Sequence, residues 1–305
     1  MSQQCNCGLL GEYRFPLSSL SFCPSCFSSK FEKRVLNSIP RFVRGHTVAI
    51  ALSGGKDSTT LLHILHKYQH KLRIPLLTAL VLEEEIPELQ SSREAIIRKI
   101  EAKYVGIEFF RNSYTELFNY SLPSLVKQSD KLDSGFTPCA ICGILRRHGI
   151  LMLAMKMGVK YIAMGNTLED EAETILLNLI RGNPWKNYRE QIRYEPADQE
   201  SLPNRFKPLS KISELTIQKY SRIHQIPALN TNCTFANRSL RSNIRGFLNS
   251  MIEKNPHVLH NIISSFKKER TNNIKVEKVY RCKRCSSYSP DPECSACRII
   301  HKLMN

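Results

Sequence analysis

The sequence lacks the features that mark membrane-spanning and secreted proteins. It contains no run of about 18 uninterrupted apolar residues, the length that a transmembrane helix needs. Its first residues, MSQQCNCG, are polar and lack the apolar segment of a secretory signal. We therefore expect a globular, cytoplasmic protein with no membrane partner. In that reducing compartment its cysteines should remain thiols or bind metals instead of forming disulfides.

Acidic residues are few, with 27 Asp and Glu against 44 Lys and Arg, which gives a formal net charge of +17. Such an excess favours a polyanionic partner, although a basic surface without a role would give the same count. Eight Lys or Arg lie between Lys267 and Arg284, and Arg238, Arg241 and Arg245 recur at helical spacing. Nucleic-acid phosphates would suit both groups.

Short apolar segments alternate with amphipathic ones over residues 38–270, which is typical of an α/β domain with a parallel sheet. The predicted strands cover residues 47–52, 76–82, 105–110 and 160–164, and the predicted helices cover residues 57–68, 88–104, 143–157 and 169–180. Residues 181–208 are polar and rich in proline, so we predict a loop there. Residues 211–266 are predicted to be mostly helical.

The cysteines are informative because all eleven fall into groups. Four lie in residues 1–37, four in residues 271–305 and three between: Cys5, Cys7, Cys23 and Cys26; Cys282, Cys285, Cys294 and Cys297; Cys139, Cys142 and Cys233. The C-terminal group consists of two C-x-x-C pairs, Cys282–Cys285 and Cys294–Cys297, with eight residues between them, a spacing typical of a zinc ribbon. Four thiolates would leave zinc no open position, so its role would be structural. At the N-terminus Cys5 and Cys7 are only two apart, which predicts a less regular zinc site.

A glycine-rich segment, Ser53-Gly54-Gly55-Lys56-Asp57-Ser58, follows the first predicted strand and begins the first helix. Its glycines let the backbone turn tightly, and the N–H groups at the helix N-terminus then face a phosphate. Ser53 and Ser58 add hydroxyl donors, and Lys56 adds positive charge. The segment is not a Walker A loop, because position 50 is Ile and position 57 is Asp. An ordinary glycine turn is the alternative.

Cys139 and Cys142 form a C-x-x-C pair at the start of a helix, one turn before Arg146. A helix N-terminus and cations lower the pKa of a thiol, so we expect reactive or metal-binding thiolates here, with buried structural thiols as the alternative. Another segment, from Gly165 to Thr174, follows the last predicted strand. Its Asp170 and neighbouring acids could hold Mg²⁺, although acids also stabilise a helix N-terminus by themselves.

These segments resemble a known family when they are taken in order. The SGGKDS loop resembles the PP-loop of the N-type ATP pyrophosphatases, which cleave ATP between the α- and β-phosphates. The loop, the C-x-x-C-G pair with its arginines, the segment from Gly165, the later Cys233 and the terminal cysteine pairs together resemble the tRNA 2-thiolation family. The resemblance covers nearly the whole chain.

The resemblance implies a Rossmann-like PP-loop domain at residues 38–270 with zinc modules at 1–37 and 271–305. It implies that the wobble uridine of tRNA is adenylated and then converted to 2-thiouridine. ATP and Mg²⁺ would be bound by the loop residues and their neighbours: Ser53, Gly54, Gly55, Lys56, Asp57, Ser58, Arg146, Gly165 and Asp170. Cys139, Cys142 and Cys233 would hold a [4Fe–4S] cluster with one open iron, or pass on a persulfide.

The same resemblance implies a ubiquitin-like sulfur carrier as partner, and a related second subunit or a homodimer. The chain departs from the family pattern in two places. Asn166 and Glu169 stand where His and Asp are usual, and Glu83-Glu84-Glu85-Ile86 replaces Asp-Glu-Gly-Ile. Two alternatives therefore stay open: a catalytically weakened, zinc-dependent tRNA-binding subunit, and a tRNA cytidine 2-thiolase. The three central cysteines argue against relatives that use ammonia.

Overall fold

The computed structural model describes residues 4–184, 186–187, 192–196, 202–231, 233–268 and 275–304. The strands are β1 (Val48–Ala51), β2 (Leu77–Glu83), β3 (Glu108–Ser113), β4 (Tyr161–Ala163), β5 (Ile192–Pro196), β6 (Asn204–Phe206), β7 (Lys275–Arg281) and β8 (Tyr288–Ser289). The helices are α1 (Pro24–Ser38), α2 (Lys56–Lys67), α3 (Pro87–Lys103), α4 (Tyr114–Phe118), α5 (Leu122–Lys131), α6 (Pro138–Lys156), α7 (Leu168–Ile180), α8 (Glu214–Ile223), α9 (Leu240–Lys254), α10 (Val258–Lys268) and α11 (Ser295–Met304), with short 3₁₀ turns η1 (Arg41–Val43) and η3 (Ala236–Arg238).

A parallel sheet forms the centre of the molecule, as predicted from the sequence. It contains the four predicted strands and also β6, in the order β3-β2-β1-β4-β6. The chain builds outward from β1 through β2 to β3 and then returns to place β4 on the other side of β1. Ligand sites in open parallel sheets form at the carboxyl ends of the strands beside such a reversal. The loop after β1, which carries SGGKDS, lies at this position.

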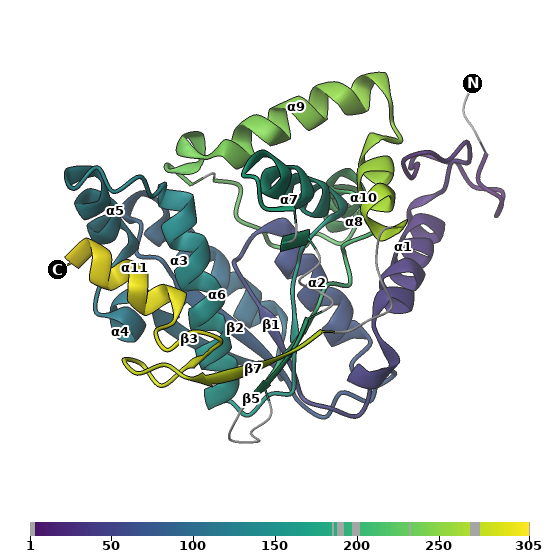
Figure 1. Cartoon of the computed structure of the whole chain (residues 1–305). Coiled ribbons are helices and arrows are strands. Elements are labelled where there is room, and N and C mark those ends of the chain that lie inside the picture. The colour runs from purple at the N-terminus through teal and green to yellow at the C-terminus, as the bar shows by residue number, and fades with distance from the viewer. Residues whose placement is uncertain are drawn as a thin grey trace.

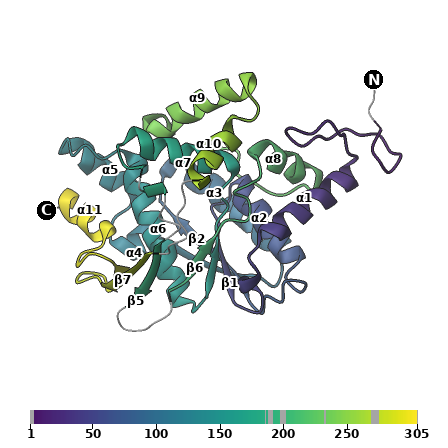
Figure 2. The same ribbon diagram turned by 45° about the vertical axis from the view of Figure 1, so that its right-hand side comes forward.

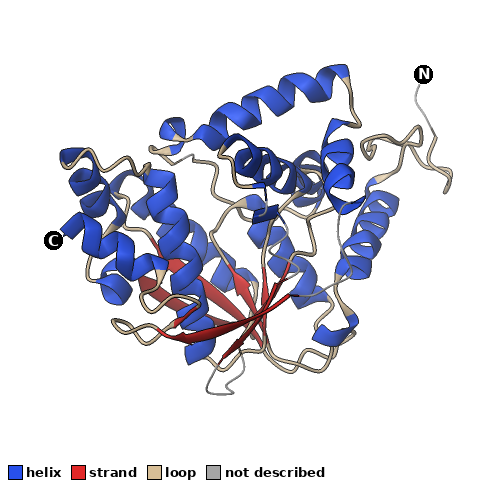
Figure 3. Ribbon diagram, in the orientation of Figure 1, coloured by secondary structure: helices blue, strands red, loops and turns tan. Residues whose placement is uncertain are grey.

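Successive residues of the central strands enter two hydrophobic cores on opposite faces of the sheet, because side chains alternate along a strand. Val48 and Ile50 of β1 pack with α1, α2, α3 and α8, whereas Ala49 packs on the opposite face. That second core is built with α4, α5, α6 and α11. Figures 1 and 3 show helices on both sides of the sheet. Burial on both faces explains the nearly continuous apolar sequence of β1 and β2.

A separate helical layer is formed by α7, α9 and α10, which enclose a small core of their own. Leu168 and Ala172 of α7 pack there against Ile244, Leu248 and Leu259. Figure 2 shows these three helices grouped together, with α7 next to the central sheet. Because α7 follows β4 directly, this layer begins at the carboxyl edge where the SGGKDS loop lies.

Several predicted boundaries are wrong. The third strand covers Glu108–Ser113 rather than residues 105–110, because Gly106 turns at φ +88° and Val105 is 80% exposed. The helix predicted at 143–157 begins at Pro138, since Thr137 caps it and proline suits its first turn. The predicted loop 181–208 contains β5 and β6, while part of it lies outside the described residues. Neither α4 nor α5 was predicted from the sequence.

Both terminal regions are joined to the central domain. At the C-terminal end, β7 pairs in parallel with β5 and antiparallel with β8, and α11 shares a core with α5 and α6. At the N-terminal end, Glu32 of α1 accepts hydrogen bonds from Lys67 Nζ (2.7 Å) and Tyr220 Oη (2.6 Å), so α1 is tied to α2 and α8. The predicted boundary at residues 270 and 271 lies outside the described residues.

Within the described residues, α6 is the one helix whose length and composition would allow it to cross a membrane. Arg146 and Arg147 lie in the middle of its sequence. Ile141, Leu145 and Leu153 of the same helix are buried in the core beneath the sheet. In this fold α6 therefore has the position of a core helix.

Candidate active site and metal centres

The SGGKDS loop has the tight backbone that its glycines predict. Gly54 adopts φ +80°, a left-handed conformation that glycine takes without steric cost. A Cβ atom at this residue would also lie 3.1 Å from Ile96 Cγ2. The Gly54 carbonyl accepts a hydrogen bond from Leu229 N at 2.8 Å. A segment far away in sequence therefore fixes the orientation of the loop.

Hydroxyl groups from both ends of the loop meet in its centre. Ser53 Oγ and Ser58 Oγ are 3.0 Å apart, and Gly55 N donates to Ser53 Oγ at 3.3 Å. Gly55 is also the N-cap of α2, and it offers no side-chain acceptor to the first-turn N–H groups. This arrangement of N–H and hydroxyl donors at a helix N-terminus suits a phosphate group.

Gly165, which the sequence placed in the nucleotide site, lies directly against this loop. A Cβ atom on Gly165 would lie 3.1 Å from both the Cα and N atoms of Ser58. These are backbone atoms that no rotamer change can move, so the close approach requires glycine. The β4–α7 connection is thereby held against the start of α2.

Lys56 and Asp57 begin α2 as an ion pair. Lys56 Nζ lies 3.0 Å from Asp57 Oδ2 and 3.2 Å from Glu214 Oε2 of α8. Burial raises the pKa of Asp57 to about 6 against the opposing effect of Lys56. Among the described atoms, the buried Asp57 Oδ1 has no hydrogen-bond partner. A buried carboxylate oxygen without a partner is a natural ligand for Mg²⁺, whose preferred ligands are oxygens.

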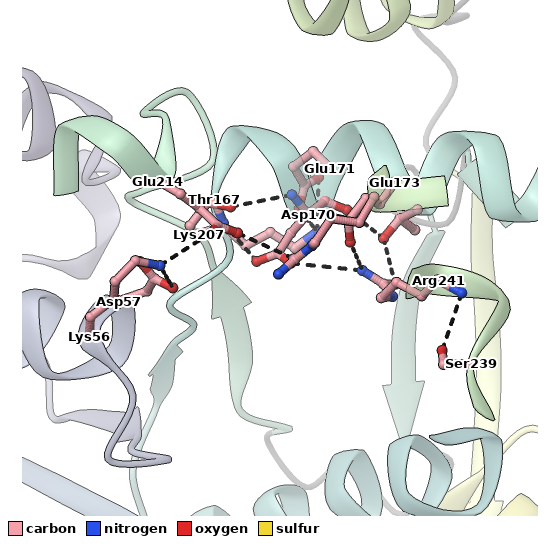
Figure 4. A network of polar contacts seen from close by, with 12 residues as sticks. Lys56, Asp57, Thr167, Asp170, Glu171, Glu173, Lys207, Glu214, Ser239 and Arg241 are labelled. Carbon is pink, nitrogen blue, oxygen red and sulfur yellow. Dashed lines mark hydrogen bonds and ion pairs between the residues drawn. The ribbon is translucent and has the colours of Figure 1, made fainter. Parts of the chain in front are cut away.

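Further carboxylates extend this group along the start of α7, as Figure 4 shows. Asp170 forms a capping box with Thr167, whose hydroxyl accepts from Asp170 N at 3.3 Å. Glu169 Oε2 accepts from Glu214 N at 2.9 Å. Burial raises the pKa of Glu169 to about 7, and the nearby carboxylates of Glu214 and Asp170 add to the effect. Asp170, the predicted Mg²⁺ ligand, thus belongs to one acidic cluster with Asp57 of the loop.

The arginines predicted to form one helical, RNA-binding face are used differently. Arg238 belongs to η3 and pairs with Asp130, whereas α9 begins only at Leu240. Arg241 and Arg245 pair with Glu173, a side chain that is 1% exposed, at 3.1 and 2.5 Å. The predicted helical face is therefore wrong for Arg238, whereas Arg241 and Arg245 do share a face of α9, which lies against the carboxylates of α7. Their contact with nucleic-acid phosphates stays a prediction.

The three central cysteines gather at the start of α6. Cys139 Sγ lies 3.8 Å from the carbonyl oxygen of Phe235, two residues after Cys233. Cys142 and Cys233 are close enough for the charge of one to raise the pKa of the other. Among the described residues these three do not form a set with all ligand atoms within 4.8 Å. The trio therefore does not enclose a single tetrahedral ion in the way that the terminal groups do, and its binding of a [4Fe–4S] cluster stays a prediction.

Two neighbouring side chains contact the thiol of Cys142. Tyr114 Oη lies 3.6 Å from Cys142 Sγ, and Arg146 Nη2 lies 3.2 Å from it. Burial raises the pKa of the Cys142 thiol, and Arg146 opposes this only in part. The prediction of a lowered thiol pKa is therefore wrong for Cys142, because the effect of burial outweighs that of the cation.

Arg146, predicted in the ATP site, connects the cysteines to the end of β2. Its Nη2 atom lies 2.6 Å from Glu84 Oε1, and Arg93 binds the other oxygen of the same carboxylate. Glu84 is 4% exposed. Its burial alone would raise its pKa, but the two guanidinium groups outweigh burial and lower the pKa. Arg146 is thus positioned by Glu84 beside Cys142.

The unusual residue Glu85 adopts the backbone that glycine would favour. Its φ is +58°, in the left-handed region. Its carboxylate accepts hydrogen bonds from Thr115 N at 2.8 Å and Thr115 Oγ1 at 2.7 Å. The turn after β2 therefore keeps its shape without glycine, and these hydrogen bonds offset the strain of the conformation.

Each terminal group of four cysteines brings its sulfurs within 4.8 Å of one another: Cys5, Cys7, Cys23 and Cys26, and Cys282, Cys285, Cys294 and Cys297. Cys7 Sγ and Cys23 Sγ are 3.6 Å apart, and Cys285 Sγ and Cys294 Sγ are 3.7 Å apart. A tetrahedron with zinc–sulfur bonds of about 2.3 Å has edges of about 3.8 Å. Both groups therefore fit one zinc ion, including the N-terminal group with its short Cys5–Cys7 spacing.

Sequence reasoning missed two residues that contact these sites. Glu214 lies 158 positions from its partner Lys56, and no local pattern links them. His148 of α6 places its Nε2 atom 3.5 Å from Cys285 Sγ and 3.4 Å from Cys294 Sγ. A single histidine at the middle of a helix gives no signal of a contact with a distant cysteine pair.

A cavity of about 470 Å³ adjoins Lys56 on the side of α3 and α8. Lys56, Lys99 and Arg222 contribute positive charge to its wall, and no carboxylate lines it among the residues that the structure describes. A cavity with this lining favours an anionic ligand.

Comparisons with known proteins agree with this geometry. Residues 27–252 match the PP-loop domain family. The chain is 30% identical over 307 residues to cytoplasmic tRNA 2-thiolation protein 1 of Drosophila virilis, covering 97% of this chain and 86% of that protein. The Drosophila melanogaster protein of the same name is 29% identical with the same coverage. The fold is similar to that of the U34-tRNA thiolase NcsA from Methanococcus maripaludis, whose structure has a [4Fe-4S] cluster, with a TM-score of 0.82, 22% identity and coverage of 99% and 97% of the two chains.

Proposed function

Because the chain belongs to the PP-loop family of the cytoplasmic tRNA 2-thiolation protein 1, we propose that it is a cytoplasmic, ATP-dependent tRNA sulfurtransferase. Its substrate is the uridine at the wobble position of tRNA, and its product is 2-thiouridine. The names of the relatives support the tRNA substrate and the cytoplasmic location. The residues of this chain supply the details of the two chemical steps.

In the first step the uridine oxygen O2 attacks the α-phosphorus of ATP, and pyrophosphate leaves. The loop from Ser53 to Ser58 binds the pyrophosphate part through its N–H and hydroxyl groups, and Lys56 neutralises charge. Asp57 and Asp170 would hold Mg²⁺ at the same phosphates, where the ion supplies charge stabilisation. The unpartnered Asp57 Oδ1 supports this assignment.

In the second step sulfur bonds to C2 of the adenylated uridine, and AMP leaves with the former O2 atom. Cys139, Cys142 and Cys233 would hold a [4Fe–4S] cluster, which supplies an open iron for sulfide when it is bound. Arg146 and Tyr114 orient Cys142 for this role. The terminal cysteine groups would bind structural zinc. The sulfur would come from a ubiquitin-like carrier protein, and the chain would act with a related second subunit or as a homodimer.

One observation carries the proposal: a single short segment contacts both halves of the site. Leu229 N donates a hydrogen bond to Gly54 O in the phosphate loop, and Phe235 O accepts one from the Cys139 thiol. Six residues of chain span at most about 20 Å, so the phosphate loop and Cys139 are close enough to contact the same bound tRNA and ATP. Cys233 is part of this segment. ATP activation and sulfur transfer can therefore act on the same base.

The net charge and the cavity beside Lys56 support a tRNA partner. The net charge of +17 favours a polyanion, and the cavity wall contributes Lys99 and Arg222 next to the phosphate loop. Part of the predicted basic group between Lys267 and Arg284 lies outside the described residues. Its role in binding tRNA remains a prediction.

The deciding experiment measures pyrophosphate release and thiouridine formation with ATP, tRNA and a sulfur source under anaerobic conditions. We expect both products from the native chain, with pyrophosphate release dependent on tRNA that carries the wobble uridine. Lys56→Ala should lower pyrophosphate release about 100-fold, as expected when a charge at a transferring phosphate is removed. Binding of tRNA without any pyrophosphate release would instead identify a tRNA-binding subunit. Thiolation of a tRNA cytidine would identify the other enzyme class.

A further inference from the structure

His148 lies against the C-terminal cysteine group, although it belongs to the helix that carries the central cysteines. Its Nε2 atom is 3.5 Å from Cys285 Sγ and 3.4 Å from Cys294 Sγ. The half-buried ring also lies near Phe118, with ring centroids 6.3 Å apart. The contact joins α6 to the C-terminal module through a polar group, next to the apolar core that they share.

The distances distinguish a hydrogen-bond donor from a metal ligand. Cys285 Sγ and Cys294 Sγ are 3.7 Å apart and form one edge of the cysteine tetrahedron. A nitrogen bound to zinc would lie about 2.0 Å from the ion and close to every sulfur. His148 Nε2 is not among the ligand atoms that lie within 4.8 Å of one another in the described chain. It therefore lies outside this edge, at hydrogen-bonding distance from both sulfurs.

We propose that His148 donates its Nε2–H to the Cys285 and Cys294 thiolates of the metal-bound C-terminal group, and so acts as a positioning residue for that metal. The inference rests on the zinc site proposed above. Four thiolates around one divalent ion leave excess negative charge, which N–H donors stabilise. Backbone N–H groups of Arg284, Cys294 and Cys297 already point to sulfurs of this group. His148 adds a side-chain donor from outside the module.

The N-terminal group serves as a reference within the same molecule. Its metal site has the same ligand set, and Cys26 N donates to Cys23 Sγ at 3.5 Å. Among the described residues no histidine lies in the metal-ligand set at either site. A change at His148 should therefore affect only the C-terminal metal.

The test uses the full-length protein loaded with Co²⁺ at both cysteine groups. His148→Phe keeps an aromatic ring but removes the donor, whereas His148→Gln keeps an N–H at a similar reach. His148→Asn is a second donor-deficient variant, because its amide is too short to reach the sulfurs. Each variant is measured for its thiolate-to-cobalt absorption band and for the rate at which a chelator removes the metal.

For H148F and H148N we expect the absorption band of one of the two cobalt ions to move to longer wavelength. The release of that ion should become about 10-fold faster, the size of effect typical of outer-shell partners. H148Q should restore both values nearly to those of the parent protein, and the other ion should be unchanged in all variants.

Unchanged spectra and release rates in both donor-deficient variants would overturn the inference. A parent spectrum that shows three sulfurs and one nitrogen at the C-terminal ion would also overturn it, since His148 would then be a ligand. If the parent bound no cobalt at the C-terminal cysteines, the proposed metal site would fail and this inference with it. Thiolation activity enters none of these readouts, so the result is independent of the proposed enzyme reaction.

Discussion

The terminal cysteine groups and the central cysteine trio (Cys139, Cys142 and Cys233) contain the same type of side chain in different surroundings. In each terminal group four sulfurs lie within 4.8 Å of one another and enclose room for one ion. Cys139, Cys142 and Cys233 form no such set in the described part of the chain, and Cys142 instead contacts Tyr114 and Arg146. Both kinds of site contain C-x-x-C pairs. The partner segment, rather than the pair, therefore decides what each site can bind.

The difference has a chemical consequence. A second cysteine pair completes the coordination of an ion and leaves it no open position, which suits a structural role. A single third cysteine on a loop leaves coordination incomplete, and here the same loop reaches the phosphate site through Leu229. The comparison thus separates the cysteines proposed to hold structural zinc from the cysteines proposed to take part in sulfur transfer.

The largest effect is expected for Cys142→Ser, which alters the central trio and leaves both terminal groups intact. We expect thiolation to fall by about 1,000-fold or more, because the sulfur site loses a ligand that acts together with the other two. Zinc should stay at two ions per chain, and the melting temperature should change little. The measurement pairs a thiouridine assay with metal analysis. A variant that keeps thiolation while losing a zinc ion would reverse the assignment of the two kinds of site.

The terminal groups should differ from each other when each loses one cysteine. Cys294 is 2% exposed within the core shared with α6, whereas Cys7 is exposed. We expect Cys294→Ser to release one zinc ion and to cost about 4 kcal/mol or more of unfolding free energy. Cys7→Ser should release the other ion at about half that cost. Denaturant unfolding and zinc analysis of both variants test the order, and equal costs would contradict it.

The sequence was sufficient for the parts of the fold and site that depend on local patterns. The short apolar run TVAIAL predicted β1, and Gly54 and Gly55 predicted the turn that follows. The parallel sheet is confirmed, and the cysteine spacing anticipated both four-sulfur groups. These features share one cause: each is encoded within a few residues, where periodicity or spacing constrains the backbone directly.

The remainder depended on contacts between distant segments. Strand β5 lies in a polar, proline-containing stretch and forms because β7, some 80 residues later, pairs with it. Arg241 and Arg245 pair with buried Glu173 on another helix, a contact that no local pattern predicted. The thiol pKa of Cys142 followed burial rather than the nearby cation. Local sequence carries no record of which segments will meet, so these errors share a physical origin.

The N-terminal end of the chain should be sensitive to acid. The N-terminal helix α1 is held partly by a polar network, in which His63 of α2 lies against His224 and Tyr104. Burial, with a smaller effect from His224, lowers the pKa of His63 to about 4. Its folded-state pKa is below the unfolded value, so its stabilisation is present above about pH 6.5 and is lost as the pH falls through about 4.

Between pH 6.5 and pH 4 we expect the parent protein to lose about 2 kcal/mol more unfolding free energy than His63→Phe does. This figure is reduced for the partial exposure of the ring. The buried Nε2 atom of His63 has no hydrogen-bond partner among the described atoms, so phenylalanine should be tolerated at neutral pH. Glu32, whose pKa is lowered by Lys67 and Tyr220 against burial, contributes acid sensitivity of its own in both proteins. Unfolding curves across this pH range measure the difference, and parallel curves would contradict the prediction.

The smallest expected effect concerns Glu85, the residue at which the chain departs from the family near the sulfur site. Glu85→Gly and Glu85→Ala both remove the hydrogen bonds to Thr115, so each loses the same interaction. Only alanine must still adopt φ +58° with a Cβ atom. We therefore expect E85A to be less stable than E85G by about 1 kcal/mol, the cost of the left-handed conformation. Equal stabilities in denaturant unfolding would mean that the turn relaxes, and that the carboxylate of Glu85, rather than the sheet around it, imposes the left-handed backbone.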